Sequence, residues 1–395
     1  MDTLPAVLYS SFDVVPSPKG ASTHITYFVR GLVESGYRVQ LVTAGDPSLP
    51  EYDTYCGAEM LRVPVGDDFN FLKRALEFGQ AVISHVEGAM EAAPYDVCHF
   101  RSIWCGLPIV QAKPRFGYKT LFEVNGLPSV ELKYHYPALK GSPVLSKIKE
   151  QEVATLLLAD VVICPSAVTR AYLASLGIPR GKVTIIPNGV DTKLFAPQPL
   201  NSRSDLPTIL YIGTLADWQG LDVLIEAMPA ILSQHPAKLR IVGRGRGRQR
   251  KDLLKRIRKL GLASSISIEP AVPHHEMPQL VAQADVCVAP LAYNDRNVTQ
   301  GCCPIKVIEY MACARPVVAS GLPVVRELVR DGADALLFTP DDPADLARCI
   351  LAILNDASLA QRLADSAVRR AHDKFSWHEA QKKLVRVYET LVRDT

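Results

Sequence analysis

The architecture is first indicated by residues 6–43, whose sequence is AVLYSSFDVVPSPKGASTHITYFVRGLVESGYRVQLVT. The two ends of this stretch, residues 6–10 and 39–43, are short apolar runs typical of buried strands. Between them, apolar residues recur at the spacing of one helix face: Ile25, Phe28, Val29, Leu32 and Val33. Gly36 stands where a helix of this length would end. So short a strand–helix–strand unit predicts a parallel sheet with a right-handed crossover.

The same alternation continues on both sides of a proline-rich segment, residues 195–207 (FAPQPLNSRSDLP). Before this segment, further buried strands are predicted at residues 97–100, 120–124, 161–164 and 183–187. After it, strands are predicted at residues 208–212, 239–242, 285–289 and 316–319, with helices between most of them. Because proline-rich segments commonly act as linkers, we predict an α/β protein with two Rossmann-like, doubly wound domains that face each other across a cleft.

Composition and charge exclude several classes of protein. With 395 residues, 48% of them hydrophobic and 22% charged, the sequence is globular rather than disordered or fibrous. Its formal net charge of +3 is too small for a protein whose whole surface binds nucleic acid. Neither a long apolar run nor a secretory pattern is present, so a cytoplasmic location is predicted. The nine cysteines lack zinc-ligand spacing, so no metal site is predicted.

The loop of residues 16–22 (PSPKGAS), between the first strand and the first helix, is one candidate for ligand binding. Backbone N–H groups at the start of a helix attract phosphate, and Gly20, followed by Ala21, would permit close approach of the backbone. A plain strand-to-helix turn explains the same residues equally well. The loop alone therefore leaves both interpretations open.

Residues 241–248 (IVGRGRGR) form a second candidate, directly after a predicted strand. Arg244 and Arg246 could contact a diphosphate with planar, bidentate geometry. The glycine spacing differs from the dinucleotide pattern, so a nicotinamide cofactor is disfavoured. From Arg244 to Lys259 there are nine basic residues and a single acid, Asp252. This stretch fits contact with an anionic membrane surface, and it equally fits a solvated helix face.

The third candidate is the segment of residues 301–312 (GCCPIKVIEYMA). Pro304 suits the first helical position, which puts Lys306 in the first turn, where the helix dipole disfavours a cation. A bound diphosphate would explain a lysine at this place. Glu309 lies in an otherwise apolar helix, where an unpaired carboxylate is costly and a ribose diol would be a suitable partner. The alternative is a Lys306–Glu309 pair on the helix surface.

Several further motifs make the sequence similar to a known family over nearly its whole length. Beside the helix of residues 304–312, the matching segments are Lys19–Ala21, Asp96–His99, Ile186–Asp191, Tyr211–Leu215, Gly220–Ala227, Arg315–Ser320 and Phe375–Trp377. Together they resemble the retaining glycosyltransferases of family 4, also described as glycosyltransferase group 1. This resemblance implies the GT-B fold. It also implies an N-terminal acceptor-binding domain over residues 1–195, joined by a crossover helix over about 375–395, and a nucleotide-sugar-binding domain over residues 196–374.

The resemblance implies a hexosyltransferase that moves a sugar from a nucleotide diphosphate donor with retention of configuration, without a metal or a separate cofactor. Catalytic positions are expected at Lys306, Glu309, Asn125 and His99. Within this set Glu309 should hold the donor ribose. The donor sugar and diphosphate should be contacted by Gly20, Ala21, Gly213, Thr214, Arg244, Arg246, Gly301, Cys302, Cys303 and Pro304.

The sequence departs from the family pattern at several polar positions. The family often has an acidic residue where Gly301 stands. It often has an arginine and a lysine at the places of Thr214 and Gln219, and a histidine at the place of Asn125. Lys306, Arg244 and Arg246 are the candidates to replace the lost positive charge. His99, at a predicted strand end, suits either a structural hydrogen bond or acceptor binding.

We therefore expect a glycosyltransferase whose donor is a nucleotide sugar, with a uridine diphosphate sugar expected ahead of others. The acceptor stays open among a saccharide, a lipid-linked acceptor and a small molecule. We expect residues 244–259 to make peripheral contact with the inner face of a membrane. Two alternatives stand beside this reading: a non-catalytic nucleotide-sugar-binding scaffold on the same fold, and a nucleotide-sugar epimerase. The epimerase would need acid and base carboxylates that the sequence does not offer as a convincing set.

Overall fold

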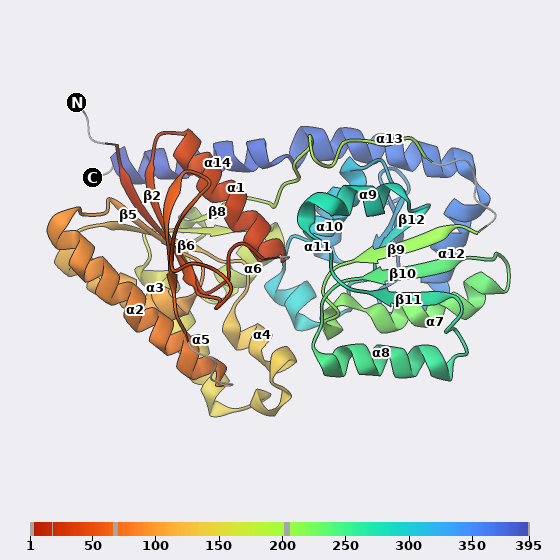
Figure 1. The fold of residues 1–395 in the computed structure, drawn as a ribbon, viewed down its shortest axis with the longest axis horizontal. Coiled ribbons are helices and arrows are strands. Elements are labelled where there is room, and N and C mark those ends of the chain that lie inside the picture. The colour runs from red at the N-terminus through yellow and green to blue at the C-terminus, as the bar shows by residue number, and fades with distance from the viewer. Residues whose placement is uncertain (1–3, 18, 66–69, 201–205, 394–395) are drawn as a thin grey trace. The chain divides into compact units, whose positions relative to one another are not determined.

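The computed structural model describes residues 4–17, 19–65, 70–200 and 206–393. The chain forms two compact units (Figure 1). Unit 1 comprises Met1–Pro187 and His378–Thr395, and unit 2 comprises Asn188–Trp377. The division thus falls after Pro187, whereas the sequence placed it after residue 195. Part of the predicted linker, residues 201–205, lies outside the described residues.

Unit 1 is built on an eight-stranded sheet with the order β3-β4-β2-β1-β5-β6-β7-β8. Its strands are β1 (Ala6–Ser11), β2 (Arg38–Ala44), β3 (Tyr52–Tyr55), β4 (Ala58–Val63), β5 (Val97–Phe100), β6 (Lys119–Glu123), β7 (Val161–Cys164) and β8 (Val183–Ile185). All neighbouring pairs are parallel except β3 with β4. The predicted parallel sheet is confirmed. The antiparallel hairpin was not predicted, because β3 is exposed and polar and carries no apolar run.

Helices cover the sheet of unit 1, and one of them comes from the end of the chain. They are α1 (Gly20–Glu34), α2 (Phe71–Ala92), α3 (Ile103–Phe116), α4 (Pro128–His135), α5 (Pro143–Leu158), α6 (Ala167–Ser175) and α14 (Trp377–Arg393), with single turns η1 (Pro137–Leu139) and η2 (Arg180–Lys182). Helix α14 runs beside α1 (Figure 1), where the Gln381 side-chain amide donates to the Tyr27 carbonyl at 2.7 Å.

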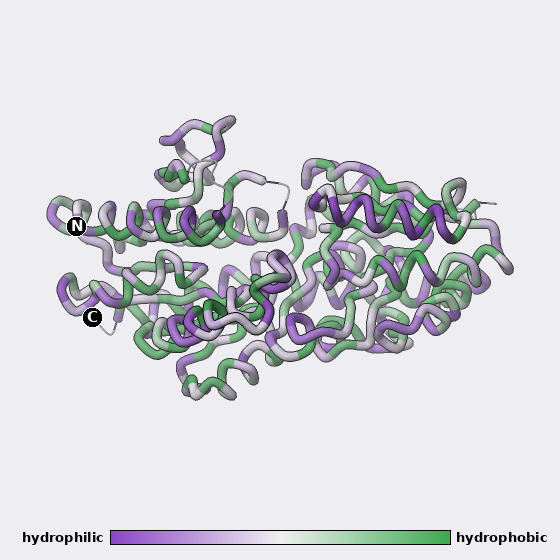
Figure 2. Tube along the Cα trace, turned by 90° about the horizontal axis from the view of Figure 1, so that it is seen from below, coloured by the Kyte–Doolittle hydropathy of each residue, from purple (hydrophilic) through white to green (hydrophobic). Residues whose placement is uncertain are grey.

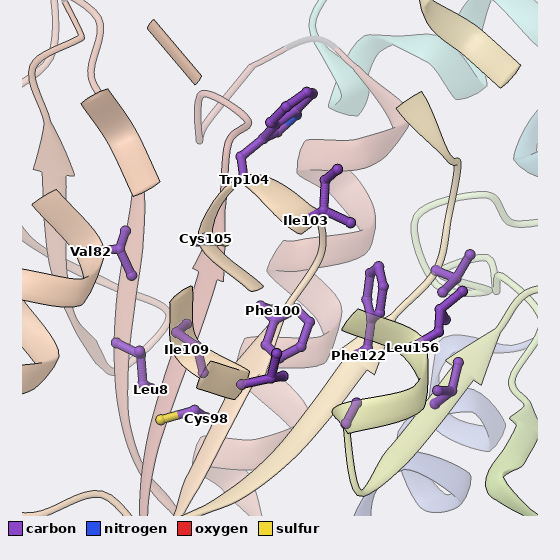
Figure 3. Packing of buried hydrophobic residues seen from close by; sticks show 14 of the residues in the cluster. Leu8, Val82, Cys98, Phe100, Ile103, Trp104, Cys105, Ile109, Phe122 and Leu156 are labelled. Atoms are coloured by element: carbon purple, nitrogen blue, oxygen red, sulfur yellow. The ribbon is translucent and has the colours of Figure 1, made fainter. Parts of the chain in front are cut away.

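The core of unit 1 lies between the sheet and these helices. Figure 3 shows Phe100 of β5 and Phe122 of β6 beside one another, with Ile109 of α3 and Leu156 of α5 packed close by. The two phenyl rings have centroids 5.0 Å apart. Burying side chains of this size stabilises a fold by about 1.5–3 kcal/mol each. This packing fixes where the strands end, and hence where the polar residues after them lie.

Unit 2 has a six-stranded, fully parallel sheet in the order β11-β10-β9-β12-β13-β14. Its strands are β9 (Thr208–Ile212), β10 (Lys238–Val242), β11 (Ile266–Glu269), β12 (Val286–Ala289), β13 (Val317–Ser320) and β14 (Leu336–Phe338). Its helices are α7 (Leu221–Leu232), α8 (Gly247–Lys259), α9 (Met277–Ala282), α10 (Ile305–Ala312), α11 (Pro323–Arg326), α12 (Pro343–Asn355) and α13 (Ala357–Lys374). Single turns are η3 (Asp217–Gln219), η4 (His274–Glu276) and η5 (Arg296–Gln300), the last of π type.

Hydrophilic and hydrophobic residues alternate along the helical turns (Figure 2), as expected for helices with one face on a sheet. Within the described part of the chain, no helix is both long and apolar enough to cross a membrane. The predicted strands of the second half are confirmed to within a residue or two. In each unit, the loops after the parallel strands bring together residues that are far apart in the sequence.

Candidate active site

In unit 2, the side chain of Lys306 reaches from the first turn of α10 to the loop after β9. Its amine lies 3.0 Å from the Tyr211 hydroxyl and 2.6 Å from Gln219 Oε1, and it sits 4.1 Å from the centre of the Tyr211 ring. The Tyr211 hydroxyl in turn donates to the Thr214 carbonyl at 2.6 Å. Lys306 therefore contacts neutral oxygens rather than Glu309, so the alternative of a surface pair on α10 is wrong.

Burial lowers the pKa of the Lys306 amine to about 7. The cause is the loss of water around the charged form of the amine. The two neighbouring oxygens are neutral, so they do not compensate for this loss with a negative charge. Cys302 and Glu309 oppose this shift, and the positive charge of Arg296 adds to it. A lysine titrating near neutrality, beside a loop at a strand end, is typical of a functional site.

Gly213 lies directly against the Lys306 amine. Its φ of +153° is one that other residues rarely adopt, and a Cβ at this position would lie 2.8 Å from Lys306 Nζ and 2.8 Å from the Tyr211 hydroxyl. The next strand end approaches equally closely, because a Cβ on Gly243 would lie 1.7 Å from the Gly213 carbonyl oxygen. Backbone hydrogen bonds join the two loops, including one of 2.9 Å from Leu215 N to the Arg244 carbonyl.

The two loops thus place the predicted donor-binding residues Gly213, Thr214 and Arg244 together, with Arg246 two residues further on. Thr214, Arg244 and Arg246 are exposed, and the Gln219 side-chain amide donates to the Thr214 hydroxyl at 3.3 Å. Both arginines lie in the loop after β10, which is hydrogen-bonded to the loop that carries Gly213. Tyr211 and Gln219 are the hydrogen-bond partners of Lys306 at this place. The sequence analysis did not predict either of them as a site residue.

Glu309 is held one turn further along α10 and is only 9% exposed. Its Oε1 lies 3.0 Å from Nε2 of His274, whose ring lies 5.2 Å from the ring of Phe195. A buried carboxylate with a single side-chain partner among the described residues keeps acceptor capacity on its second oxygen. Sequence reasoning missed His274, because a histidine in an irregular segment carries no periodic signal.

The segment before α10 is buried at Gly301, Cys302 and Cys303. Gly301 has a φ of +82°, which favours glycine. The helix begins at Ile305, so Pro304 lies at the N-cap position, one residue before the first helical position predicted for it. The Cys303 carbonyl accepts from the Asn188 side chain at 2.7 Å, and Cys302 Sγ lies 4.0 Å from Asn297 Oδ1. Burial raises the pKa of the Cys303 thiol, so this group stays protonated at neutral pH.

In unit 1, five donors converge on the buried carboxylate of Glu123 at the end of β6. The distances are 2.6 Å from the Tyr9 hydroxyl, 2.7 Å from Arg101 Nε, 2.9 Å from His24 Nε2 and 3.0 Å from His99 Nε2, and the fifth donor is the Asn125 side-chain amide. We call these six residues the Glu123 cluster. Burial alone would raise the pKa of Glu123, but His24, Arg101 and the hydrogen bonds hold it well below its usual range.

The sheet explains why these side chains meet. Tyr9 pairs in register with His99, and His99 with Leu121, so the three side chains lie on one face. Arg101 and Glu123 lie two residues further along the same strands, and strand periodicity returns them to that face. The spacings His99-x-Arg101 and Glu123-x-Asn125 were therefore a usable signal in the sequence.

His99 lies in the interior of unit 1, with no exposed surface. Its Nδ1 lies 2.7 Å from the hydroxyl of Tyr388 on α14, and burial lowers its pKa. A neutral ring that donates from Nε2 to Glu123 and accepts the Tyr388 proton at Nδ1 satisfies every group. These contacts fit the structural alternative for His99, while its catalytic role stays a prediction.

The Glu123 cluster also reaches the predicted phosphate loop. Gly20 and Ala21 begin α1, and an Arg101 N–H lies 3.4 Å from the Ala21 carbonyl and 3.2 Å from Asp13. A cavity of about 10 Å³, room for one water, is lined by His24, Phe28, Glu123, Val124, Asn125, Ile163, Cys164, Pro165 and Ile186. Among the described residues, no group of three or more histidine, cysteine or carboxylate side chains is placed to hold a metal ion.

Comparison with known families fits this arrangement. Residues 18–194 match the family described as Glycosyltransferase Family 4, and residues 206–356 match the Glycosyl transferases group 1. Together these segments take in most of both sheets. The chain belongs to glycosyltransferase family 4. As a member of this family, the protein is a glycosyltransferase.

Relatives of this family 4 glycosyltransferase cover nearly its whole length at low identity. An uncharacterized glycosyltransferase of Methanocaldococcus jannaschii is 26% identical over 94% of each chain. A D-inositol 3-phosphate glycosyltransferase of Thermobispora bispora is 26% identical over 93% of this chain and 89% of its own.

Solved structures show that the two units have the GT-B fold. Sucrose-phosphate synthase from Thermosynechococcus elongatus has a TM-score of 0.85 at 22% identity, over 100% of both chains. The Anabaena protein HepE, solved in complex with UDP-glucose, has a TM-score of 0.76 at 19% identity, over 98% of this chain and 99% of its own.

Proposed function

We propose that this family 4 glycosyltransferase transfers a hexosyl group from a UDP-sugar with retention of configuration and without a metal ion. The observation that carries the proposal is the Lys306 amine, which lies partly buried against Gly213. Its hydrogen-bond partners in the described part of the chain are two neutral oxygens. A cation in such a place lacks a counter-charge, and a diphosphate would supply one. The proposed donor base follows HepE, which was solved with UDP-glucose.

The diphosphate is proposed to lie at the ends of β9 and β10. Lys306 supplies a positive charge, the Gly213 backbone allows close approach, and the exposed Arg244 and Arg246 provide two further guanidinium groups. That Gly20 and Ala21, at the start of α1, contact a diphosphate stays a prediction from the sequence. Positive side chains that are already in place can stabilise the charge that develops on the leaving diphosphate, a role often filled by a metal ion.

The ribose is proposed to bind Glu309. Since His274 occupies Oε1, the second carboxylate oxygen could accept hydrogen bonds from a diol. The backbone of residues 301–304 is proposed to contact the sugar, and a sugar contact of Asn125 stays a prediction from the sequence. In this mechanism the leaving diphosphate assists deprotonation of the acceptor, while the protein positions both substrates.

The proposed acceptor class is a phosphorylated or lipid-linked polyol or saccharide, as suggested by the relative named for D-inositol 3-phosphate. Helix α8 adds a possible site of contact with an anionic membrane. Leu253 and Ile257 form its buried stripe, and its exposed basic residues are Arg248, Arg250, Lys251, Lys255, Arg258 and Lys259. Sedimentation with vesicles, with and without phosphatidylglycerol, tests this contact. Equal binding to both would contradict an electrostatic contact.

The donor is tested first by calorimetric titration of UDP, GDP and ADP at one salt concentration. We expect UDP to bind with a dissociation constant of about micromolar order, and the other two more weakly. UDP-glucose and related donors are then assayed with myo-inositol 3-phosphate, in EDTA and in magnesium. The anomeric configuration of the product is read by NMR. Absence of nucleotide binding would contradict the proposal, whereas nucleotide binding without turnover of any donor would favour the non-catalytic scaffold. An inverted product, or activity lost in EDTA, would contradict the mechanism.

A further inference from the structure

We propose that Lys306 takes up a proton when the diphosphate of the donor binds, and that Gln219 is the positioning residue that allows this by giving the empty amine a neutral partner. The proton comes from solvent and returns to it when the nucleotide leaves, so no covalent step is involved. The inference rests on the proposed function, because it takes Lys306 as a diphosphate contact.

The partners of Lys306 match a neutral amine. Gln219 Oε1 can only accept a hydrogen bond, and the Tyr211 hydroxyl already donates its proton to the Thr214 carbonyl. The structure therefore offers the amine two acceptors, and a neutral amine has two N–H groups to donate. The orientation of Gln219 is fixed from its other end, because its amide nitrogen donates to the Thr214 hydroxyl at 3.3 Å.

Among the residues that the structure describes, no charged group is a counter-ion in contact with the amine. Tyr211 on β9 stays protonated, because burial raises its pKa well above the usual value. Glu309, on the same helix as Lys306, is hydrogen-bonded to His274. Cys302, before the helix, favours the charged amine, and Arg296 on η5 disfavours it. Burial outweighs these influences and brings the pKa of Lys306 to about 7.

A bound diphosphate reverses this balance. Negative oxygens at contact distance favour the ammonium form and raise the pKa of the amine. With an empty-site pKa of about 7, proton uptake on binding should rise from about 0.1 at pH 6 to about 0.5 at pH 7 and about 0.9 at pH 8. By the same linkage, donor affinity should fall as pH rises above 7, by up to about tenfold per unit.

Calorimetric titration of UDP-glucose in buffers of different ionisation enthalpy measures this uptake. The diphosphate of UDP-glucose is fully ionised across pH 6 to 8, so the counted protons belong to the protein. Lys306→Arg carries a permanent charge and should take up about none through this position. Gln219→Glu places a carboxylate beside the amine and should reduce the uptake severalfold, with weaker donor binding. Lys374→Arg, on the exposed end of α13, is the matched control and should behave as the wild type.

Equal uptake in the wild type and in Lys306→Arg would overturn the inference, and so would binding at pH 8 with no proton uptake. In both cases the proposed nucleotide-binding function would stand. Failure of every nucleotide to bind would overturn both. Should a variant not fold, the wild type alone decides the matter. The Cε resonance of Lys306 should titrate near pH 7 in the empty protein and move above about pH 9 with saturating UDP-glucose. A titration near pH 10 in the empty protein would overturn the inference.

Discussion

Both units place a buried tyrosine on a central strand against a charged side chain, but they treat the charge in opposite ways. In unit 1, Tyr9 of β1 donates to Glu123, which has four further donors around it. In unit 2, Tyr211 of β9 accepts from Lys306, whose one other hydrogen-bond partner among the described residues is the neutral Gln219. The negative charge of Glu123 is thus balanced by hydrogen-bond donors and positive groups, whereas a positive charge on Lys306 has only neutral oxygens in contact with it among the described residues.

The difference is the one expected between a group that holds the fold together and a group that binds a ligand. A carboxylate offers about four acceptor positions, so five donors leave Glu123 no capacity for a substrate. Such a saturated group anchors strands and loops. An undercompensated cation gains most from an incoming anion, and this gain can be used for binding or catalysis. The following predictions test whether the two groups differ as their surroundings imply.

The largest effect is expected for Glu123→Ala. Removing the carboxylate leaves the charge of Arg101 buried without its closest partner, and breaking a buried ion pair costs about 3–5 kcal/mol. We expect the urea unfolding transition of unit 1 to move to much lower denaturant. Glu379→Ala, which removes an exposed partner of Lys382 on α14, is the control and should leave the transition unchanged. A Glu123 variant as stable as this control would show that the cluster contributes little to the fold.

The second effect concerns binding rather than stability. Glu309→Gln keeps the shape of the side chain and removes its charge, so the contact with a ribose diol should weaken. We expect the dissociation constant for UDP to rise about 10- to 100-fold, since hydrogen bonds to charged groups contribute about 1.5–3 kcal/mol. The melting temperature should change by only a few degrees. Unchanged affinity would remove Glu309 from the nucleotide site.

The two sites differ in how far the sequence could predict them. The sequence predicts Lys306 and Glu309 as site residues because each breaks a local rule: Lys306 is a cation at a helix start, and Glu309 is a carboxylate in an apolar helix. The contact between Gln219 and Lys306 was not predicted, because these residues meet only when the ends of two structural elements come together. His274 likewise reaches Glu309 from an irregular segment.

The fold was more accessible than the sites, because hydrophobic periodicity is a local property. Buried strands such as β1 and β9 are apolar runs, and their parallel order follows from the intervening helices. The exposed, polar strand β3 has no such pattern. The Glu123 cluster depends on sheet register, which places Tyr9 beside His99. Register is set by packing across the whole sheet and cannot be taken from any one segment.

The third effect is a gain of stability in Lys306→Met. The pKa of Lys306 is lowered in the folded protein, so the unfolded chain binds more protons between about pH 7 and 10.5, and the wild type is penalised there and at lower pH. After allowance for the two lost hydrogen bonds and for partial exposure, we expect the variant to be about 1–2 kcal/mol more stable at pH 6 to 7. The advantage should shrink as pH rises toward 10. Urea unfolding at pH 6, 7.5 and 9 measures it, and a stability difference that does not change with pH would argue against the lowered pKa.

The smallest effect tests how far the saturated cluster of unit 1 extends. The hydroxyl of Tyr388 lies 2.7 Å from Nδ1 of His99 and ties the last helix, α14, to the cluster. Tyr388→Phe keeps the packing and leaves this ring nitrogen without a donor, which should lower the free energy of unfolding by about 1 kcal/mol, with UDP affinity unchanged. In a double-mutant cycle with Glu123→Gln, a coupling energy above about 0.5 kcal/mol would show that His99 transmits the interaction from α14 to the carboxylate. A coupling near zero would show that the hydrogen bond between Tyr388 and His99 acts independently of the charge of Glu123. The cooperative part of the cluster would then be limited to the sheet and α1.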